Sequence, residues 1–503
     1  MRMNHTLLAT FVITVLGATV AAQSAFADSN ESINTSNVMV SHGVASGDVS
    51  SDSAVIWSRA NAESTMHVLL KGNKGAVHQR LRVSAEDDFA GKLLLTDLKP
   101  DTEYSYSVWF SAAEHDGGRM NAVDGRFRTA PKADKAKAVS FAWAGDVAGQ
   151  NTCRDAHEGF PAFKAINAMQ LDFFIGLGDM IYADGTCEAT GRYGNAQVAG
   201  DFELAADMPN YWAHWKYNRA DNGYRQLLAS MPYYAIWDDH EVVNDFGPLH
   251  DTRDTAPYTP GDHLLPKGLA AFMDYNPVAE SSQTPKRLYR SVKWGKNMEM
   301  FIIDTRQYRD ANFAADSEAQ PKTMLGREQL VWLKDALKKS DATWKIIASS
   351  VPMSIPTGSS GPRGRDGWAN YQQEGGFEYE LTDILRFMQQ NGMQNVVFLT
   401  TDVHFAEGFQ YVPFADAPDF KVYEFVSGPF NAGVFPNRAF DTSLNAERLF
   451  FFGAESSSDV TSWEQAKSWF NYGAIKIDEE GELTVSINDV NGDAVYEISL
   501  QAK

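Results

Sequence analysis

Four consecutive ionisable side chains follow an apolar, strand-like run at residues 233–237. These side chains are Asp238, Asp239, His240 and Glu241. Carboxylates that lie so close together repel one another, and their pKa values rise steeply unless cations neutralise the charge. The stretch therefore indicates a binding site for cations rather than a turn that merely ends a buried strand.

Carboxylates also follow four other apolar runs, which cover residues 141–145, 171–178, 300–303 and 396–400. The carboxylates at the ends of these runs are those of Asp146, Asp179, Asp304 and Asp402. Functional groups of α/β folds gather at the carboxyl ends of strands. We therefore expect these side chains to meet at one edge of a sheet.

The types of side chain narrow the choice of cation. Besides carboxylates, the set contains the phenol of Tyr182, the imidazoles of His240 and His404 and the amide of Asn244, without a thiolate. Such ligands suit ferric iron at Tyr182, and calcium, manganese or zinc at the carboxylates. Two ions about 3.5–4 Å apart, bridged by one aspartate, activate water for in-line attack on phosphorus.

The elements that position these residues alternate between strands and helices. Residues 344–348 form another strand-like run, and three more lie at 474–478, 483–487 and 494–500. The helical period is followed by Leu381, Ile384, Leu385 and Met388, with Gly392 as the stop signal. Residues 138–503 are therefore predicted to form an α/β domain.

Residues 37–132 have the pattern of an all-β domain, and a short polar linker follows them. The β-prone runs lie at 53–59, 66–70, 92–96 and 102–110. In the last run, Tyr104, Tyr106, Val108 and Phe110 alternate onto one face. The turn at residues 100–101 resembles the tyrosine corner of immunoglobulin-like sandwiches.

The start of the chain predicts export. Arg2 precedes an apolar run that begins at Leu7, and an A-x-A cleavage pattern ends at Ala27. Residues 1–27 are therefore expected to be a general secretory signal peptide, with a periplasmic or extracellular product and no membrane anchor after its removal. Cys153 and Cys187 are expected to form a disulfide in that oxidising space, with free or metal-bound thiols as the alternative.

The formal net charge of −21 disfavours nucleic acid and anionic membranes as partners. The same charge repels phosphorylated substrates. An enzyme for such substrates needs local positive charge, which bound cations supply.

Several segments carry a family resemblance. They are HGVASGD at 42–48, AVIWSR at 54–59, LGDMIY at 177–182, WDDHE at 237–241 with Asn244 and Asp245, DTRQYR at 304–309, MLGREQ at 324–329 and DVH at 402–404. In this order they resemble the PhoD-like alkaline phosphatases of the calcineurin-like metallophosphoesterase superfamily. The resemblance implies an αββα four-layer α/β sandwich with an N-terminal all-β domain of immunoglobulin or fibronectin type, and hydrolysis of phosphate esters.

The resemblance also implies roles for single residues. Asp179 is expected to bridge two metals, Tyr182 and His404 to hold a ferric ion, and Asp239 and Asp402 to hold the second metal. His240 takes the place of the histidine that contacts phosphate and protonates the leaving group. At the first metal position, where PhoD-like enzymes commonly have cysteine, this chain has Asp146, as purple acid phosphatases do.

Some assignments stay open at this point. Asp238 and Asn244 are metal ligands or supporting residues, and the stretch at 238–241 would also suit the N-terminal cap of a helix. Asp304 and Arg306 are as well explained by a buried ion pair. Arg363 and Arg365, in a Gly-rich loop, either clamp a phosphate or face solvent.

The leading hypothesis is an exported phosphatase that hydrolyses phosphate monoesters, and diesters as further substrates, by in-line attack of a metal-bound hydroxide. Its expected cofactors are Fe³⁺ with Ca²⁺, or alternatively Mn²⁺ or Zn²⁺, and its expected partners are small phosphorylated compounds. The alternatives are a phosphodiesterase of phospholipase D type on the same scaffold and a calcium-stabilised surface binding module.

Overall fold

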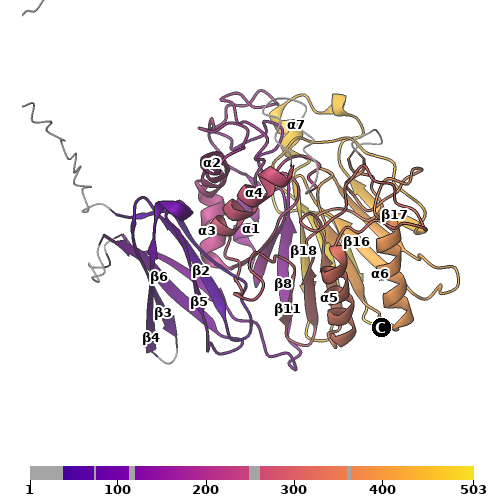
Figure 1. Cartoon of the computed structure of the whole chain (residues 1–503), viewed down its shortest axis with the longest axis horizontal. Helices are drawn as coiled ribbons and strands as arrows, with labels where there is room; N and C mark the ends of the chain where they lie inside the picture. Colours follow the sequence, from indigo (N-terminus) through magenta and orange to yellow (C-terminus); the bar gives the residue numbers. More distant parts are fainter. Residues whose placement is uncertain (1–37, 73–74, 113–118, 120, 248–260, 359–363) are drawn as a thin grey trace, which may run out of the picture. The chain divides into compact units, whose positions relative to one another are not determined.

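The computed structural model describes residues 38–503 apart from 73–74, 113–118, 120, 248–260 and 359–363 (Figure 1). The predicted signal peptide at 1–27 and the side chain of Arg363 lie outside the described residues. Within them, every helix is too short or too polar to cross a lipid bilayer.

The N-terminal region is built from two layers of strands with an apolar core between them. One layer contains β4 (Gly75–Val83), β3 (Ser64–Gly72), β6 (Glu103–Ser111) and β7 (Val123–Arg128), in this order. The other contains β1 (Val40–Gly47), β2 (Ala54–Ala60) and β5 (Ala90–Leu95). The predicted face of β6 is buried in this core, and the hydroxyl of Tyr104 accepts a hydrogen bond from the backbone N–H of Lys99 at 2.9 Å across the preceding turn.

The layer formed by β1, β2 and β5 continues into the sheet of the following domain. β1 pairs in parallel with β10 (Pro232–Ile236), with Ser46 opposite Pro232. Asp48, which ends the HGVASGD segment, reinforces this junction because its carboxylate lies 2.7 Å from Arg290. The N-terminal strands therefore extend the sheet that carries the candidate site.

Two mixed sheets form the centre of the second domain within the described chain. The first has the order β20-β19-β18-β8-β9-β10-β1-β2-β5, and the second has the order β11-β12-β13-β14-β16-β15-β17. The bounds in the first sheet are β8 (Val139–Ala144), β9 (Phe173–Leu177), β18 (Asn471–Ile477), β19 (Leu483–Asp489) and β20 (Ala494–Leu500). Those in the second are β11 (Arg290–Trp294), β12 (Met298–Ile302), β13 (Trp344–Ala348), β14 (Val396–Thr400), β15 (Ala406–Tyr411), β16 (Val422–Val426) and β17 (Ala446–Phe452).

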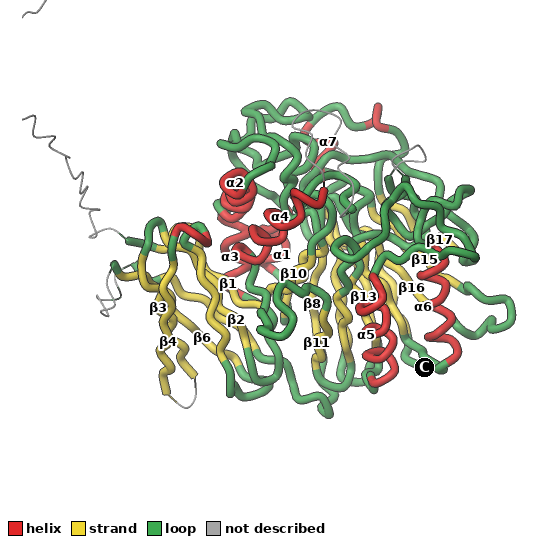
Figure 2. Tube along the Cα trace, in the orientation of Figure 1, coloured by secondary structure: helices red, strands yellow, loops and turns green. Residues whose placement is uncertain are grey.

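Helices cover the outer faces of the two sheets, as Figure 2 shows for α5 and α6. The first sheet is covered by α1 (Ala162–Ala168), α2 (Met208–Arg219), α3 (Asn222–Ser230) and α4 (Gly261–Tyr275). The second is covered by α5 (Gly326–Lys339) and α6 (Glu378–Gln390), and the short α7 (Trp463–Lys467) precedes β18. The inner faces share one large apolar core, to which Trp143 and Trp344 belong.

Helix α6 shows how well the local sequence predicts an element of the fold. Its predicted apolar stripe is buried against the outer face of the second sheet. Gly392, two residues beyond the helix, has a φ of +65°, which glycine adopts readily. The predicted fold class, an αββα sandwich with an N-terminal β domain, is confirmed.

Candidate metal centre

Strand ends from both sheets bring the predicted carboxylates together. β8, β9, β10 and β14 each end two or three residues before an aspartate of the group. Close approach of β9 and β10 requires glycine at position 178, which has a φ of +102°. A Cβ at Gly178 would lie 2.4 Å from the Cβ of Asp238.

The carboxylates of Asp146, Asp179, Asp239 and Asp402 form what we call the acidic cluster. One ligand atom each from Asp146, Asp179 and His404 lie within 4.8 Å of one another, and so do atoms from Asp179, Asp238, Asp239 and Asp402. Asp179 belongs to both groups.

The acidic cluster has too few hydrogen-bond donors for its buried oxygens. Among the described residues, both carboxylate oxygens of Asp146 and one each of Asp179, Asp239 and Asp402 have no partner. Burying an unpaired charge costs far more than burying a paired one. Cations satisfy such oxygens, so the residues present fit a metal centre.

Electrostatics in the cluster lead to the same conclusion. Burial raises the pKa of Asp146 well above its ordinary value, and the charge of Asp238 adds to this effect. The pKa values of Asp179 and Asp402 are raised in the same way, by burial first and then by Asp239 and Asp238 respectively. Bound cations would restore the ionised state of these three groups.

Backbone strain also marks the site. Asp146, Asp179, Asp402 and His404 have φ values of +62°, +53°, +79° and +61°. L-residues rarely adopt this left-handed region, and such conformations persist where the surroundings impose them, often at functional sites.

Tyr182 and His404 lie together beside Asp146. The hydroxyl of Tyr182 is 2.9 Å from Nε2 of His404, and this nitrogen is 3.8 Å from Oδ1 of Asp146. Nδ1 of His404 donates to the backbone oxygen of Gly433, which leaves Nε2 unprotonated and directed at the cluster. Burial lowers the pKa of His404 to about 3, so the imidazole is neutral, as a metal ligand must be.

His240 is held by a carboxylate that sequence reasoning missed. Nδ1 of His240 lies 2.6 Å from Oδ1 of Asp184, whose other oxygen accepts the backbone N–H of Asn244 at 2.8 Å. Burial opposes protonation of His240, but the carboxylates of Asp184 and Asp239 outweigh it and raise the pKa to about 10. The available signal was the position of Asp184 in the loop that begins at Asp179.

The open alternatives at residues 238–245 are now decided in part. These residues form turns rather than the N-terminus of a helix, so the helix-cap interpretation is wrong. Oδ1 of Asp238 accepts hydrogen bonds from Nε of Arg306 and from Ser350, both at 2.6 Å, and Oδ2 has no hydrogen-bond partner among the described residues. Asn244 is an exposed residue.

Asp304 and Arg306 do not form the predicted ion pair with each other, and each side chain has other partners. Besides Asp238, the buried guanidinium of Arg306 pairs with Asp366 at 2.9 Å. Asp304 lies outside the acidic cluster and accepts hydrogen bonds from the indole of Trp237 at 2.9 Å and from backbone N–H groups. Arg365 is buried, with its guanidinium 5.5 Å from the centre of the Tyr371 ring.

Glu241 completes the frame of the site without joining the cluster. Its Oε1 accepts the backbone N–H of Met180 at 2.8 Å, and its Oε2 accepts those of Asp179 and Asp238 at 3.0 and 2.9 Å. This one carboxylate therefore ties the end of β9 to the end of β10. Nearby, Cys153 and Cys187 are joined by a disulfide.

Comparison with known proteins gives this geometry a context. Residues 141–487 match the model of the PhoD-like phosphatase family, and residues 24–131 match that of the PhoD-like phosphatase N-terminal domain. Over 427 residues the chain is 28% identical to alkaline phosphatase D of Bacillus subtilis (strain 168). The matched region covers 77% of this chain and 68% of that protein.

Solved structures show the same fold. The structure of PhoD superposes with a TM-score of 0.71 at 20% identity, over 93% of this chain and 94% of that one. Purple acid phosphatase PPD1 from yellow lupin superposes with a TM-score of 0.58 at 13% identity, over 91% of this chain and 73% of that one. The chain belongs to the PhoD-like phosphatase family and is a phosphoric ester hydrolase of the alkaline phosphatase type.

Proposed function

We propose that this chain is an exported, metal-dependent phosphatase that hydrolyses phosphate monoesters. The observation that carries the proposal is the set of buried carboxylate oxygens without a hydrogen-bond partner in the described chain, which lies beside the His240–Asp184 pair. Cations at these oxygens would turn the most acidic part of a chain with a net charge of −21 into a site that attracts phosphate.

The ligand groups support two adjacent cation positions. Asp146, Asp179, Tyr182 and His404 surround one, and Asp179, Asp239 and Asp402 surround the other, with Asp179 common to both. The phenol and imidazole suit Fe³⁺ at the first, and the carboxylates suit Ca²⁺ at the second, with Mn²⁺ or Zn²⁺ as alternatives. When bound, such ions supply positive charge and Lewis acidity towards phosphate oxygens.

His240 is the proposed proton donor. Its Nδ1 is held by Asp184, so Nε2 is the nitrogen left to face the substrate. Burial opposes protonation of His240, but the carboxylate of Asp184, which lies outside the acidic cluster, raises its pKa, so the imidazolium can deliver a proton to the leaving oxygen.

Export is supported by chemistry within the chain. A disulfide persists in oxidising compartments, and Cys153 and Cys187 form one. The secretory pattern at residues 1–27 agrees with this location.

Two measurements test the proposed function. The first compares the rates on p-nitrophenyl phosphate and bis(p-nitrophenyl) phosphate, together with elemental analysis of unchelated protein. We expect bound metal and a faster monoester reaction. A faster diester reaction would favour the phosphodiesterase alternative, and metal without turnover of either ester would favour the calcium-stabilised binding module.

The second measurement tests the role of His240. His240→Ala should lower kcat by about 10²–10⁴-fold while the metal content stays unchanged. His157→Ala, which removes an exposed histidine, is the matched control and should keep the wild-type rate. A His240→Ala variant with near wild-type kcat would exclude the assigned role.

A further inference from the structure

We propose that the Cys153–Cys187 disulfide is a positioning cross-link of the metal centre. It holds the loop that carries Tyr182 against the loop that carries Asp146, so that its reduction releases the Tyr182 side of the site. The inference rests on the proposed function, because it concerns the same centre.

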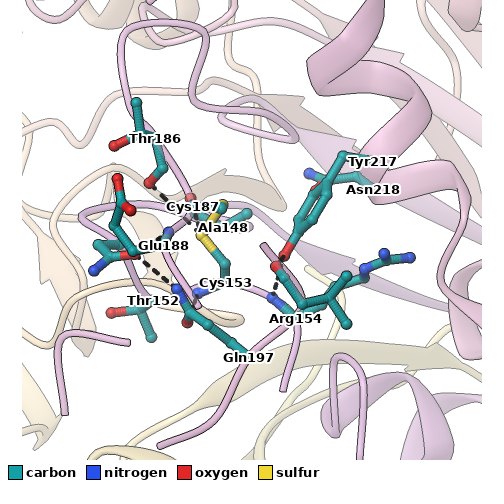
Figure 3. Close-up of a disulfide and its surroundings, with 12 residues drawn as sticks. Ala148, Thr152, Cys153, Arg154, Thr186, Cys187, Glu188, Gln197, Tyr217 and Asn218 are labelled. Atoms are coloured by element: carbon teal, nitrogen blue, oxygen red, sulfur yellow. Dashed lines mark hydrogen bonds between the residues drawn. A yellow bond between two sulfur atoms is a disulfide. The ribbon is translucent and has the colours of Figure 1, made fainter. Parts of the chain in front are cut away.

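The disulfide joins the two loops that leave β8 and β9 (Figure 3). Asp146 precedes Cys153 in the first loop, and Tyr182 precedes Cys187 in the second. Both sulfur atoms belong to buried residues, and the backbone N–H of Cys153 donates to the side chain of Gln197 at 3.0 Å. A candidate ligand of the metal centre therefore precedes each cysteine, Asp146 by seven residues and Tyr182 by five.

The first loop also forms the surface on which Tyr182 lies. A Cβ at Gly149 would be 2.4 Å from the Tyr182 ring, so the ring rests directly on the backbone of that loop. The centre of the Tyr182 ring is 4.1 Å from that of His240, and its hydroxyl is 2.9 Å from His404. A shift of the first loop therefore removes the surface on which the phenol rests beside the two histidines.

The first loop is strained and depends on its surroundings to keep its shape. Asp146, Ala148, Gln150 and Asn151 have φ values of +62°, +76°, +52° and +54°. Residues with side chains occupy this region at an energetic cost and stay there only while the structure around them enforces it. A covalent link at the end of the loop provides such enforcement.

Hydrogen bonds between the loops are unevenly distributed. Near the strand ends, the backbone N–H of Val147 donates to the oxygen of Asp179 at 2.7 Å, so Asp146 and Asp179 stay joined without the disulfide. Further out, the backbone N–H groups of Arg192 and Val198 donate to the oxygens of Asn151 and Arg154, both at 2.8 Å, so the outer parts of the loops are also joined by hydrogen bonds. Between these two sets of bonds, the stretch from Tyr182 to Cys187 is joined to the first loop by the disulfide.

This distribution predicts a selective effect of reduction. Cation binding at the position formed by Tyr182, His404 and Asp146 should weaken, whereas cation binding at the position formed by Asp179, Asp239 and Asp402 should persist. In the redox step a phosphine reductant supplies two electrons, water supplies two protons to the sulfur atoms and its oxygen to the phosphine, and the products are two thiols and a phosphine oxide.

The chain provides its own control for this chemistry, because it has two cysteines in total. A reductant that changes wild-type protein through the disulfide must leave the Cys153→Ser, Cys187→Ser double variant unchanged. Reoxidation can restore only the original bond within one chain.

The experiment measures bound metal per chain, the kcat and KM for p-nitrophenyl phosphate and the melting temperature, with and without reductant. Wild-type protein should lose about one equivalent of metal on reduction and at least tenfold in kcat, with a smaller change in KM. The double variant should show the same losses before any reductant is added. A lower melting temperature with unchanged metal content and kcat would overturn the proposal and leave a stabilising bond only.

A second pair of variants keeps the disulfide intact. Gly149→Ala pushes the Tyr182 ring away and should reproduce the loss of metal and kcat. Gly185→Ala is the matched control, because its nearest contact would be an ordinary 3.5 Å. Equal metal content in the two variants would contradict the positioning role. Wild-type protein without phosphatase activity would instead contradict the proposed function, while the metal measurement still decides the role of the disulfide.

Discussion

The carboxylates of Glu241 and of the acidic cluster are buried in the same part of the molecule, yet their surroundings differ. Both oxygens of Glu241 accept backbone N–H groups. In the part of the chain that the structure describes, both oxygens of Asp146 and one each of Asp179 and Asp402 have no donor. Burial of a charge therefore does not by itself indicate a ligand, whereas several buried carboxylate oxygens without a donor, gathered within 4.8 Å of one another, do.

Asp238 lies between these two cases. One of its oxygens is neutralised by Arg306 and Ser350, while the other is without a partner among the described residues. Burial opposes the charge of Arg306, but Asp238 and Asp239 raise its pKa above its usual value, so the guanidinium remains a cation. We interpret Asp238 as a supporting carboxylate of the metal centre, because the charge on one of its oxygens is already compensated by Arg306.

The largest effect is expected from Asp179→Asn. The substitution removes the carboxylate common to both ligand groups, so the cations lose their shared ligand. We expect kcat/KM to fall at least ~10³-fold, about 4 kcal/mol, together with the metal content. In metal-free protein the same change relieves repulsion, so the free energy of unfolding should not fall. A variant with wild-type metal content and rate would place Asp179 with Glu241 instead.

Glu241→Ala, in contrast, should lower the free energy of unfolding more than it lowers the rate. It leaves three buried N–H groups without an acceptor, and each costs about 1 kcal/mol or more. Urea unfolding of metal-free protein should therefore show a loss on the order of 3 kcal/mol. Glu241→Gln keeps one carbonyl oxygen and should lose less. Equal stability of wild type and Glu241→Ala would show that these bonds contribute nothing.

Removal of metal should make stability depend on pH. Burial and mutual repulsion raise the pKa values of Asp146, Asp179 and Asp402 above the ordinary 3.8, so the folded metal-free protein holds protons that the unfolded chain releases. Its free energy of unfolding should fall as the pH rises above 3.8, by roughly 1.4 kcal/mol per pH unit for each such proton. Melting curves at several pH values with and without chelator measure this slope. Burial also raises the pKa values of Glu407 and Glu424 away from the centre, so a slope of the same steepness with and without bound metal would contradict the prediction.

Much of this site was predictable because it follows local sequence. Each cluster carboxylate comes one or two residues after an apolar run, and the alternation of strands and helices fixes which ends of the strands carry loops. The stripe of α6 and the inward face of β6 were equally local, because burial repeats with the period of the element.

The missed features all depend on contacts between distant residues. Asp184 pairs with His240, which lies 56 residues further along the sequence. Arg306 forms ion pairs with the distant Asp238 and Asp366 rather than with Asp304, two residues away. The parallel pairing of β1 with β10 joins the two domains through two pairs of residues, Ser46 with Pro232 and Gly47 with Tyr233. No periodicity encodes these pairs, since each depends on the order of strands in the sheet.

The smallest effect is expected where the same chemical change as Asp179→Asn is made at a carboxylate that the protein already satisfies. Glu380 on α6 accepts the backbone N–H groups of Met324 and Leu325, both at 2.9 Å, and the hydroxyl of Thr323 at 2.5 Å. In Glu380→Gln the amide oxygen can keep both N–H groups, and the hydroxyl can turn to accept from the new NH₂ group. We therefore expect less than about 1 kcal/mol of lost stability, with unchanged metal content and kcat. A loss of metal from Glu380→Gln would mean that replacing any buried carboxylate by an amide disturbs the centre, and the distinction between satisfied and unsatisfied oxygens would no longer identify its ligands.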